Sequence, residues 1–291
     1  MKNIKGIILA GGKATRLKPI TNVISKQLLP LYDKPMIYYP VSTLMQAGIK
    51  EMLIITNEEN IDNFHNLLKD GSQWGISIEY AVQKEANGLA EAYLIAENFI
   101  YGYPTALILG DNFFHGDKLQ AIIESKKNSQ FGATIFAYEV KDPKRYGVIN
   151  FNKEGIVLNI EEKPNHPKSN FAMTGLYICD NTVLEKAKKV TFSGRGELEI
   201  TDIVNMYIAE RSLNVELLDR GNTWLDTGTY DSLHDASTYI RTIENRQGIK
   251  IGCPEEIAWR KKWITDENLK FSAKQYSKSG YGEYLLNIMK K

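Results

Sequence analysis

The sequence predicts an α/β fold in which a mostly parallel mixed sheet is flanked by helices. Short apolar runs, such as residues 7–10 and 105–109, stop at glycines, as buried strands often do. Between such runs lie segments with apolar residues at helical spacing. Because parallel neighbours in a sheet need a crossover connection, this alternation favours parallel strands over hairpins in the first half of the chain.

The predicted elements follow in chain order. In the first half we expect strands at residues 7–10, 51–56, 76–82, 105–109 and 132–140, and helices at residues 37–47, 59–69, 89–99 and 119–127. The second half is more broken. There we expect a strand pair at 146–151 and 156–160, strands at 174–178 and 215–218, and helices at 181–188, 199–211 and 230–245.

Composition excludes several classes of protein. The 291 residues are 43% hydrophobic and 24% charged, with a net charge of +1, which is ordinary globular composition. We therefore expect no nucleic-acid partner, and no membrane, since no apolar run approaches the ~18 residues that span a bilayer. Cys179 and Cys253 form no disulfide framework and lack metal-ligand spacing, which predicts a cytoplasmic protein.

The opening segment, residues 5–35, has the features of a triphosphate cradle. Gly11 and Gly12 let backbone N–H groups approach an anion, and Arg16 and Lys26 add positive charge. A pair of glycines after a strand is also an ordinary turn, so the spacing alone leaves both readings open. A P-loop is excluded because Gly12-Lys13 is followed by alanine rather than by Ser or Thr.

The acidic residues of the sequence allow two kinds of ligand site. A dinucleotide fingerprint would use Asp33, but prolines at positions 30 and 35 argue against a central strand there. Asp111 follows an apolar strand through Gly110, and Asp226 follows a second short apolar segment. Each aspartate alone could be a turn residue, but together they offer the oxygen ligands that Mg²⁺ prefers. Ligands of such sheets lie beyond the carboxyl ends of the strands, where the opening loop, Gln83 and Asp111 are expected.

The stretch LAGGKATRLKPITNVISKQLLP resembles the signature of the sugar-1-phosphate nucleotidyltransferases. The longer run SKQLLPLYDKPMIYYP looks like the thymidylyltransferase branch of that family, and RYGV, EEKP, RGELEITD, WLDTGT and ENRQG follow in family order. One departure is that the family's glycine before Thr15-Arg16 is Ala14 here. If that backbone needs a positive φ or touches phosphate, the alanine hinders it.

The resemblance implies a fold, a reaction and an organisation. The fold would be a Rossmann-like mixed sheet of the nucleotide-diphospho-sugar transferase type, with a small C-terminal helical appendage. The core would span residues 1–246, with a nucleotide-binding part at about 1–131 and a sugar-phosphate part at about 132–246, followed by a helical segment at 247–291. The reaction would be the Mg²⁺-dependent formation of dTDP-glucose and pyrophosphate from dTTP and glucose 1-phosphate. It would serve deoxysugar (dTDP-rhamnose-type) and surface polysaccharide synthesis, in a cytoplasmic homotetramer.

The resemblance also implies roles for particular residues. Catalysis is expected from Arg16, Lys26, Asp111 and Lys163, and metal binding from Asp111 and Asp226. The nucleotide is expected at Leu9, Gly11, Gly12, Thr15, Arg16, Lys26, Gln27, Gln83, Gly88 and Asp111. The sugar phosphate is expected at Asn112, Tyr146, Gly147, Glu162, Lys163, Thr174, Tyr177, Arg195 and Trp224.

A regulatory, feedback site is implied at His115, Gly116, Arg220, Glu256 and Ile257. Family members often have Tyr-Tyr-Gly-His where this chain has Phe114-His115-Gly116-Asp117, which leaves the feedback ligand open. Two alternative functions also stay open. The same chemistry could use UTP or another hexose 1-phosphate, or the chain could be a non-catalytic nucleotide-sugar-binding homologue, for which Ala14 is the only support.

Overall fold

The structure is a computed structural model that describes residues 3–12, 14–116, 119–126 and 132–290. Its strands are β1 (Lys5–Leu9), β2 (Pro30–Leu31), β3 (Lys34–Pro35), β4 (Glu51–Thr56), β5 (Ser77–Val82), β6 (Thr105–Leu109), β7 (Asn112–His115), β8 (Ala133–Glu139), β9 (Gly147–Phe151), β10 (Val157–Glu162), β11 (Phe171–Cys179), β12 (Leu213–Leu217) and β13 (Thr223–Asp226). Its α-helices are α1 (Tyr38–Gln46), α2 (Ile61–Leu68), α3 (Glu91–Ile95), α4 (Glu97–Ile100), α5 (Leu119–Lys126), α6 (Val183–Ala187), α7 (Ile200–Ala209), α8 (Tyr230–Gln247), α9 (Pro254–Arg260), α10 (Asp266–Gln275) and α11 (Gly280–Ile288).

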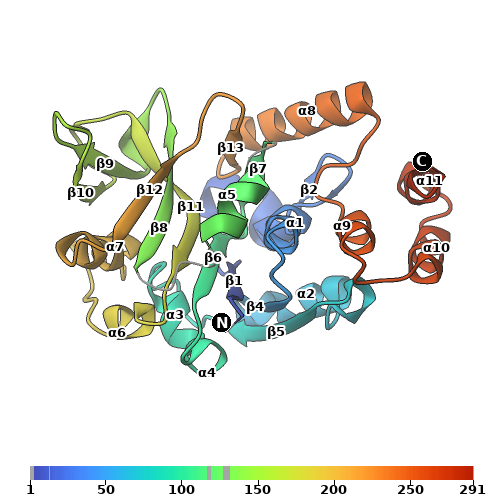
Figure 1. The fold of residues 1–291 in the computed structure, drawn as a ribbon, viewed down its shortest axis with the longest axis horizontal. Coiled ribbons are helices and arrows are strands. Elements are labelled where there is room, and N and C mark those ends of the chain that lie inside the picture. Colours follow the sequence, from blue (N-terminus) through green and yellow to red (C-terminus); the bar gives the residue numbers. More distant parts are fainter. Residues whose placement is uncertain (1–2, 13, 117–118, 127–131, 291) are drawn as a thin grey trace.

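The predicted mixed sheet flanked by helices is confirmed (Figure 1). Its main path runs β10-β9-β11-β6-β1-β4-β5, and β8 pairs with both β11 and β12. Strands β6, β1, β4 and β5 are parallel neighbours, as the alternation of strands and helices predicts. Strand β11 runs antiparallel to β6, β8 and β9, and β10 runs antiparallel to β9, so the antiparallel pairs of this sheet gather around β11 and β9.

Helices cover both faces of this sheet because successive strand residues point to opposite sides. On one face, Ile8 packs in a cluster with Phe64 of α2 and residues of α1 and α9. On the other face, Ile7 packs with Tyr93 of α3 and residues of α6 and α7. Both faces of β1 are therefore buried, which explains why its sequence is an unbroken apolar run rather than an alternating one.

Several short elements differ from the sequence-based expectation. The single helix expected at 89–99 is divided into α3 and α4 at Ala96, where ψ is 1°. Helical hydrogen bonds meet at Ala96 from both sides: its N–H donates to Ala92 O (3.0 Å), and its carbonyl accepts from Ile100 N (2.9 Å). Strands β7 and β13 form a separate two-stranded ribbon that periodicity did not reveal, because four residues are too few to show a period.

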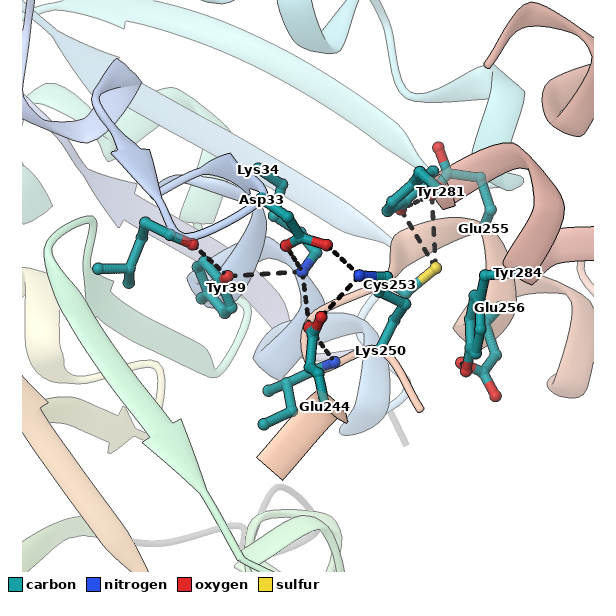
Figure 2. A network of polar contacts seen from close by, with 12 residues as sticks. Asp33, Lys34, Tyr39, Glu244, Lys250, Cys253, Glu255, Glu256, Tyr281 and Tyr284 are labelled. Atoms are coloured by element: carbon teal, nitrogen blue, oxygen red, sulfur yellow. Dashed lines mark hydrogen bonds and ion pairs between the residues drawn. The ribbon is translucent and has the colours of Figure 1, made fainter. Parts of the chain in front are cut away.

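The C-terminal segment has an apolar cluster of its own, and a polar network ties it to the rest of the chain (Figure 2). Glu244 of α8 accepts from Lys34 (3.0 Å), from Lys250 (2.7 Å) and from the backbone N–H of Ile251 (2.9 Å). Asp33 pairs with both lysines. Within the described residues, no helix combines the length and apolar character needed to cross a bilayer.

Candidate active site

Two cavities open at the carboxyl ends of the parallel strands. The first, which we call the glycine-loop cavity, has a volume of about 470 Å³ and is lined by Gly11, Gly12, Thr15, Lys26 and Gln83, among others. The second, the carboxylate cavity, has a volume of about 160 Å³ and is lined by Arg16, Asp111, Glu162, Lys163, Tyr177 and Asp226, among others. An ion pair between Lys26 and Asp111 links the residues of the two cavities.

Gln83 is held against the glycine loop by contacts on both sides. Its Nε2 donates to Glu91 (2.8 Å) and to the carbonyl of Gly88 (3.3 Å). A Cβ atom on Gly11 would lie 2.7 Å from Gln83 Oε1, so only glycine at position 11 leaves room for the amide. Gly88 has a φ of +112°, and a side chain there would overlap the backbone of Leu198. The glycines therefore position an amide whose Nε2 donates within the protein and whose Oε1 can accept a hydrogen bond beside the cavity.

Ala14 adopts the left-handed backbone conformation, which glycine tolerates better than alanine. Its φ is 44° and its ψ is 41°, which costs a non-glycine residue roughly 1–2 kcal/mol. The loop is held in place by hydrogen bonds to the carbonyl of Ala14 from Thr21 Oγ1 (2.9 Å) and Leu17 N (3.0 Å). The following Thr15 and Arg16 are exposed at the start of a 3₁₀ turn, Thr15–Leu17.

Other residues predicted at the nucleotide serve to position the loop. Leu9 lies in the core, and its carbonyl accepts from the N–H of Gly110 (2.9 Å). Gln27 is buried, packs against Gly110 and accepts from Ser25 Oγ (2.7 Å). Neither residue lines the two cavities, whereas Gly12 does, with open space where a Cβ would be.

The β7–β13 ribbon brings the two aspartates together. Asp226 pairs in register with Asn112, the neighbour of Asp111, and the carbonyl of Asp111 accepts from Thr227 Oγ1 (2.8 Å). Burial and the charge of Asp111 raise the pKa of Asp226. Burial alone would also raise the pKa of Asp111, but Lys26 and a hydrogen bond from Asn112 hold it below its usual value.

Two carboxylates in mutual repulsion are a donor set that suits a divalent cation. Among the residues the structure describes, no group of three His, Cys, Asp or Glu side chains forms a closed metal cage. The arrangement fits an ion that takes two protein carboxylates and leaves its other positions to water and to substrate phosphate, as Mg²⁺ does.

The side of the carboxylate cavity opposite the loop is formed by aromatic and amide side chains. Asn112 Oδ1 accepts from Trp224 Nε1 (2.6 Å) and from Gly175 N (3.0 Å), so this buried amide ties β7, β11 and β13 together. The ring of Tyr146 packs edge-on against Trp224, with centroids 5.1 Å apart. Burial and the charge of Glu162 raise the pKa of Tyr177 far above its usual value, so its hydroxyl stays protonated.

Glu162, Lys163 and Gly147 meet at the end of the β9–β10 pair. Gly147 stands opposite Glu162 in the ladder, and Lys163 Nζ lies 3.6 Å from Glu162 Oε1. Arg195 also pairs with Glu162 (3.3 Å), but its guanidinium is shared with Glu197 (3.1 Å). Arg195 does not line the carboxylate cavity, so the structure brings it next to the site through Glu162 rather than into it.

Thr174 is a further predicted contact that the structure does not bring to the carboxylate cavity. Thr174 was expected to touch the sugar phosphate, but its side chain is fully buried and does not line the carboxylate cavity. Its neighbours Met173 and Gly175 do line the cavity. Because side chains alternate along a strand, Thr174 points to the other face of β11.

Two of the five predicted regulatory residues line a common cavity. His115 and Gly116 line a third cavity of about 270 Å³ together with Tyr39 and Gly252. Arg220, Glu256 and Ile257 do not line it; Arg220 is exposed, and Glu256 pairs with Arg260 (2.7 Å). Asp117, at the end of the FHGD segment, lies outside the described residues.

Arg145 was missed by the sequence analysis. It lines the carboxylate cavity, and its guanidinium lies 3.4 Å from Asp226. Arg145 is the first residue of the run RYGV. Tyr146 and Gly147 of that run are among the predicted sugar-phosphate residues, and Arg145 directly precedes them. A basic side chain directly before two predicted site residues is a reasonable candidate, but only the fold shows which carboxylate it meets.

Comparisons with known proteins identify the family of this chain. The family described as nucleotidyl transferase matches residues 5–243. Glucose-1-phosphate thymidylyltransferase of Neisseria meningitidis is 52% identical over 99% of this chain and 100% of its own length. The protein of the same name from Mycobacterium tuberculosis strain H37Rv is 51% identical, with the same coverage of both chains.

Two solved structures share the fold. A provisionally assigned glucose-1-phosphate thymidylyltransferase from Bacillus anthracis, in complex with sucrose, aligns with a TM-score of 0.76 and 41% identity over 82% of this chain and 95% of its own. A UDP-glucose pyrophosphorylase complexed with UDP-glucose aligns with a TM-score of 0.72 and 27% identity over 83% of this chain and 99% of its own. The chain therefore belongs to the nucleotidyl transferase family, within its glucose-1-phosphate thymidylyltransferase group.

Proposed function

We propose that this chain transfers the thymidylyl group of dTTP to α-D-glucose 1-phosphate, giving dTDP-glucose and pyrophosphate. The observation that carries the proposal is the carboxylate cavity, which Arg16 and Lys163 line together with Asp111 and Asp226, with Lys26 paired to Asp111. The names of the relatives, aligned over nearly the whole of both chains, support the choice of substrates.

The chemistry requires little from the protein beyond positioning and charge. A phosphate oxygen of the sugar phosphate attacks the α-phosphorus of the triphosphate, and pyrophosphate leaves on the opposite side. The nucleophile is already an anion, so the step needs neither a general base nor a covalent intermediate. The barrier is repulsion between two polyanions, which fixed cations and exclusion of water reduce.

The basic residues would contact different phosphate groups of the two substrates. Arg16, exposed beside the glycine loop, would stabilise charge on the α-phosphate and on the departing pyrophosphate. Lys26 would contact the triphosphate or the metal region, where it already pairs with Asp111. Lys163 would hold the incoming sugar phosphate, with Arg195 joining it by leaving its carboxylate partners.

Asp111 and Asp226 would hold Mg²⁺. When bound, Mg²⁺ neutralises and orients the triphosphate. The remaining recognition falls to neutral and acidic groups: Gln83 would pair with the edge of the thymine, and Glu162 would accept from sugar hydroxyls. Tyr146 and Trp224 would pack against the sugar ring.

A pyrophosphate-release assay tests the proposal. The purified chain is given dTTP, UTP and other triphosphates with several hexose 1-phosphates, with and without Mg²⁺. We expect the highest kcat/KM for dTTP with glucose 1-phosphate, and activity only with the divalent ion. A preference for UTP or another hexose would move the proposal to the alternative substrates. No turnover with any pair would leave a non-catalytic nucleotide-sugar-binding protein, against which Arg16, Lys26, Asp111, Lys163 and Asp226 all argue.

The wider context of the enzyme is proposed on the same basis. We place it in the cytoplasm, as a homotetramer that supplies deoxysugar and surface polysaccharide synthesis, with feedback at the cavity lined by His115 and Gly116. We also propose the division into a core, residues 1–246, and a helical segment, residues 247–291, which has its own apolar cluster. Light scattering after size exclusion measures the oligomer, and a mass of one chain would contradict the tetramer.

A further inference from the structure

Both aspartates of the carboxylate cavity already have a cationic partner. Lys26 pairs with Asp111, and Arg145 pairs with Asp226, with 3.4 Å between Nη2 and Oδ2. Asp111 and Asp226 are the carboxylates to which the proposed function assigns the divalent ion. A metal ion that binds to Asp226 would therefore compete with the guanidinium of Arg145 for the same carboxylate.

The two cations differ in their freedom to move. The side chain of Lys26 is 10% exposed and lines the glycine-loop cavity, whereas that of Arg145 is 38% exposed. Arg145 ends a 3₁₀ turn, Pro143–Arg145, and its guanidinium carbon lies 5.8 Å from the ring centroid of Tyr146. A side chain that is already this exposed to water can reorient at less cost than a buried one, and a planar guanidinium can hold two phosphate oxygens at once.

We propose that Arg145 is a placeholder cation, which occupies Asp226 until the divalent ion binds and then turns to the phosphate of the sugar phosphate. The inference rests on the proposed function and adds a residue to it. In the absence of metal, the pairing keeps Asp226 from facing Asp111 uncompensated. With metal bound, the released guanidinium has an anion to receive in the same cavity, which Lys163 also lines.

If Arg145 has this role, removal of its positive charge changes the affinity for metal and the affinity for the sugar phosphate in opposite directions. Arg145→Gln removes the competitor at Asp226, so the affinity for metal rises. The same change removes a phosphate ligand, so the affinity for the sugar phosphate falls. A purely structural role for Arg145 would weaken both, because a distorted cavity binds neither ligand well.

The test measures the two affinities separately. Binding of Mn²⁺ alone is followed by the EPR signal of the free ion, and binding of glucose 1-phosphate by calorimetry at saturating Mn²⁺. For Arg145→Gln we expect Mn²⁺ to bind roughly 2- to 5-fold more tightly, the scale of a partly exposed ion pair. We expect glucose 1-phosphate to bind about 10-fold more weakly, the scale of a lost charged hydrogen bond.

Two further variants make the result specific. Arg241→Gln removes an exposed arginine of α8 and should change neither affinity. Arg145→Lys keeps the charge but loses the fork, so Mn²⁺ affinity should stay near that of the unchanged chain while sugar-phosphate affinity still falls. It also covers the case in which Arg145→Gln fails to fold, which circular dichroism reports.

Equal Mn²⁺ affinity in Arg145→Gln and the unchanged chain, or no detectable binding in either, overturns the inference. So does weaker binding of both ligands in a folded variant. These results are independent of turnover. An unchanged chain that makes dTDP-glucose but fails the Mn²⁺ comparison refutes the placeholder role alone, whereas a chain without turnover refutes the proposed function.

Discussion

Replacing Gly11 by alanine tests whether the glycine loop and the amide of Gln83, which we propose to read the base, act as one unit. The added Cβ would lie 2.7 Å from Gln83 Oε1, closer than real Cβ contacts allow, and 3.4 Å from Gln83 Cβ. The amide cannot turn away freely, because its Nε2 donates to Glu91 and to the carbonyl of Gly88. The substitution therefore forces either the loop or the amide to move.

The size of the effect follows from the hydrogen bonds at stake. Loss of one to two such bonds costs about 1–3 kcal/mol, which corresponds to roughly 5- to 150-fold in the kcat/KM for dTTP. Because the amide is the group that would distinguish thymine, the ratio of kcat/KM for dTTP to that for dCTP should fall as well. A loss of affinity shared equally by both nucleotides would mean that only the phosphate cradle had been disturbed.

Gly12→Ala is the matched control. A Cβ at position 12 meets no atom within 4 Å, so it cannot displace Gln83 even if it hinders a phosphate. We expect this variant to keep the dTTP-to-dCTP ratio of the unchanged chain. If Gly11→Ala retains both the ratio and the kcat/KM for dTTP, then Gln83 does not read the base from the position described above.

The remaining predictions concern charge, strain and stability. Arg16→Ala should reduce kcat on the order of 10²-fold or more, the scale of one lost transition-state donor, and near-normal turnover would refute its role. Ala14→Gly should raise the free energy of unfolding by at most about 1 kcal/mol, since relief of the left-handed alanine is partly offset by the larger unfolded-state entropy of glycine; a lower melting temperature would contradict this. Lys34→Met should lower the free energy of unfolding in urea by about 2–4 kcal/mol, because its carboxylate partner on α8 is buried. Lys188→Met breaks an exposed ion pair and should lower it by less than about 1 kcal/mol. Equal losses in the two variants would mean that burial of the pair does not matter here. Burial alone would raise the pKa of Asp33, but Lys34 and Lys250 lower it, so the stabilisation by this carboxylate is present above its unfolded pKa of about 3.9 and is lost as the pH falls below that value. The difference in melting temperature between the unchanged chain and Asp33→Asn should therefore shrink from pH 6 to pH 3, and a constant difference would count against the ion pairs.

The general position of the site could be predicted because it follows from local patterns. Apolar strands that end at glycines predict a parallel sheet, and a parallel sheet places its ligands at one edge. Gly11, Asp111 and Gln83 were located in this way before any contact was known. Their hydrogen-bond partners could not be located, because Gln83 depends on Glu91 and on the backbone conformation of Gly88.

Contacts between distant segments had no local signal. The register between β7 and β13 sets Asp226 opposite Asn112. A shift of this register by one residue would turn the side chain of Asp226 to the other face of the ribbon. Thr174 shows the same sensitivity, because its neighbours line the cavity while its own side chain faces away. Arg195 lies beside the site, but three carboxylates within its reach decide where the guanidinium rests.

By itself, the sequence determined the alternation of strands and helices, the glycine loop and the identity of the charged groups. Each of these depends on neighbours a few residues away, whose spacing is printed in the chain. Only the tertiary structure decided which opposite charges meet, Lys26 with Asp111 and Arg145 with Asp226. The partners in these pairs are 85 and 81 positions apart, so strand register and packing choose them, and no local preference can.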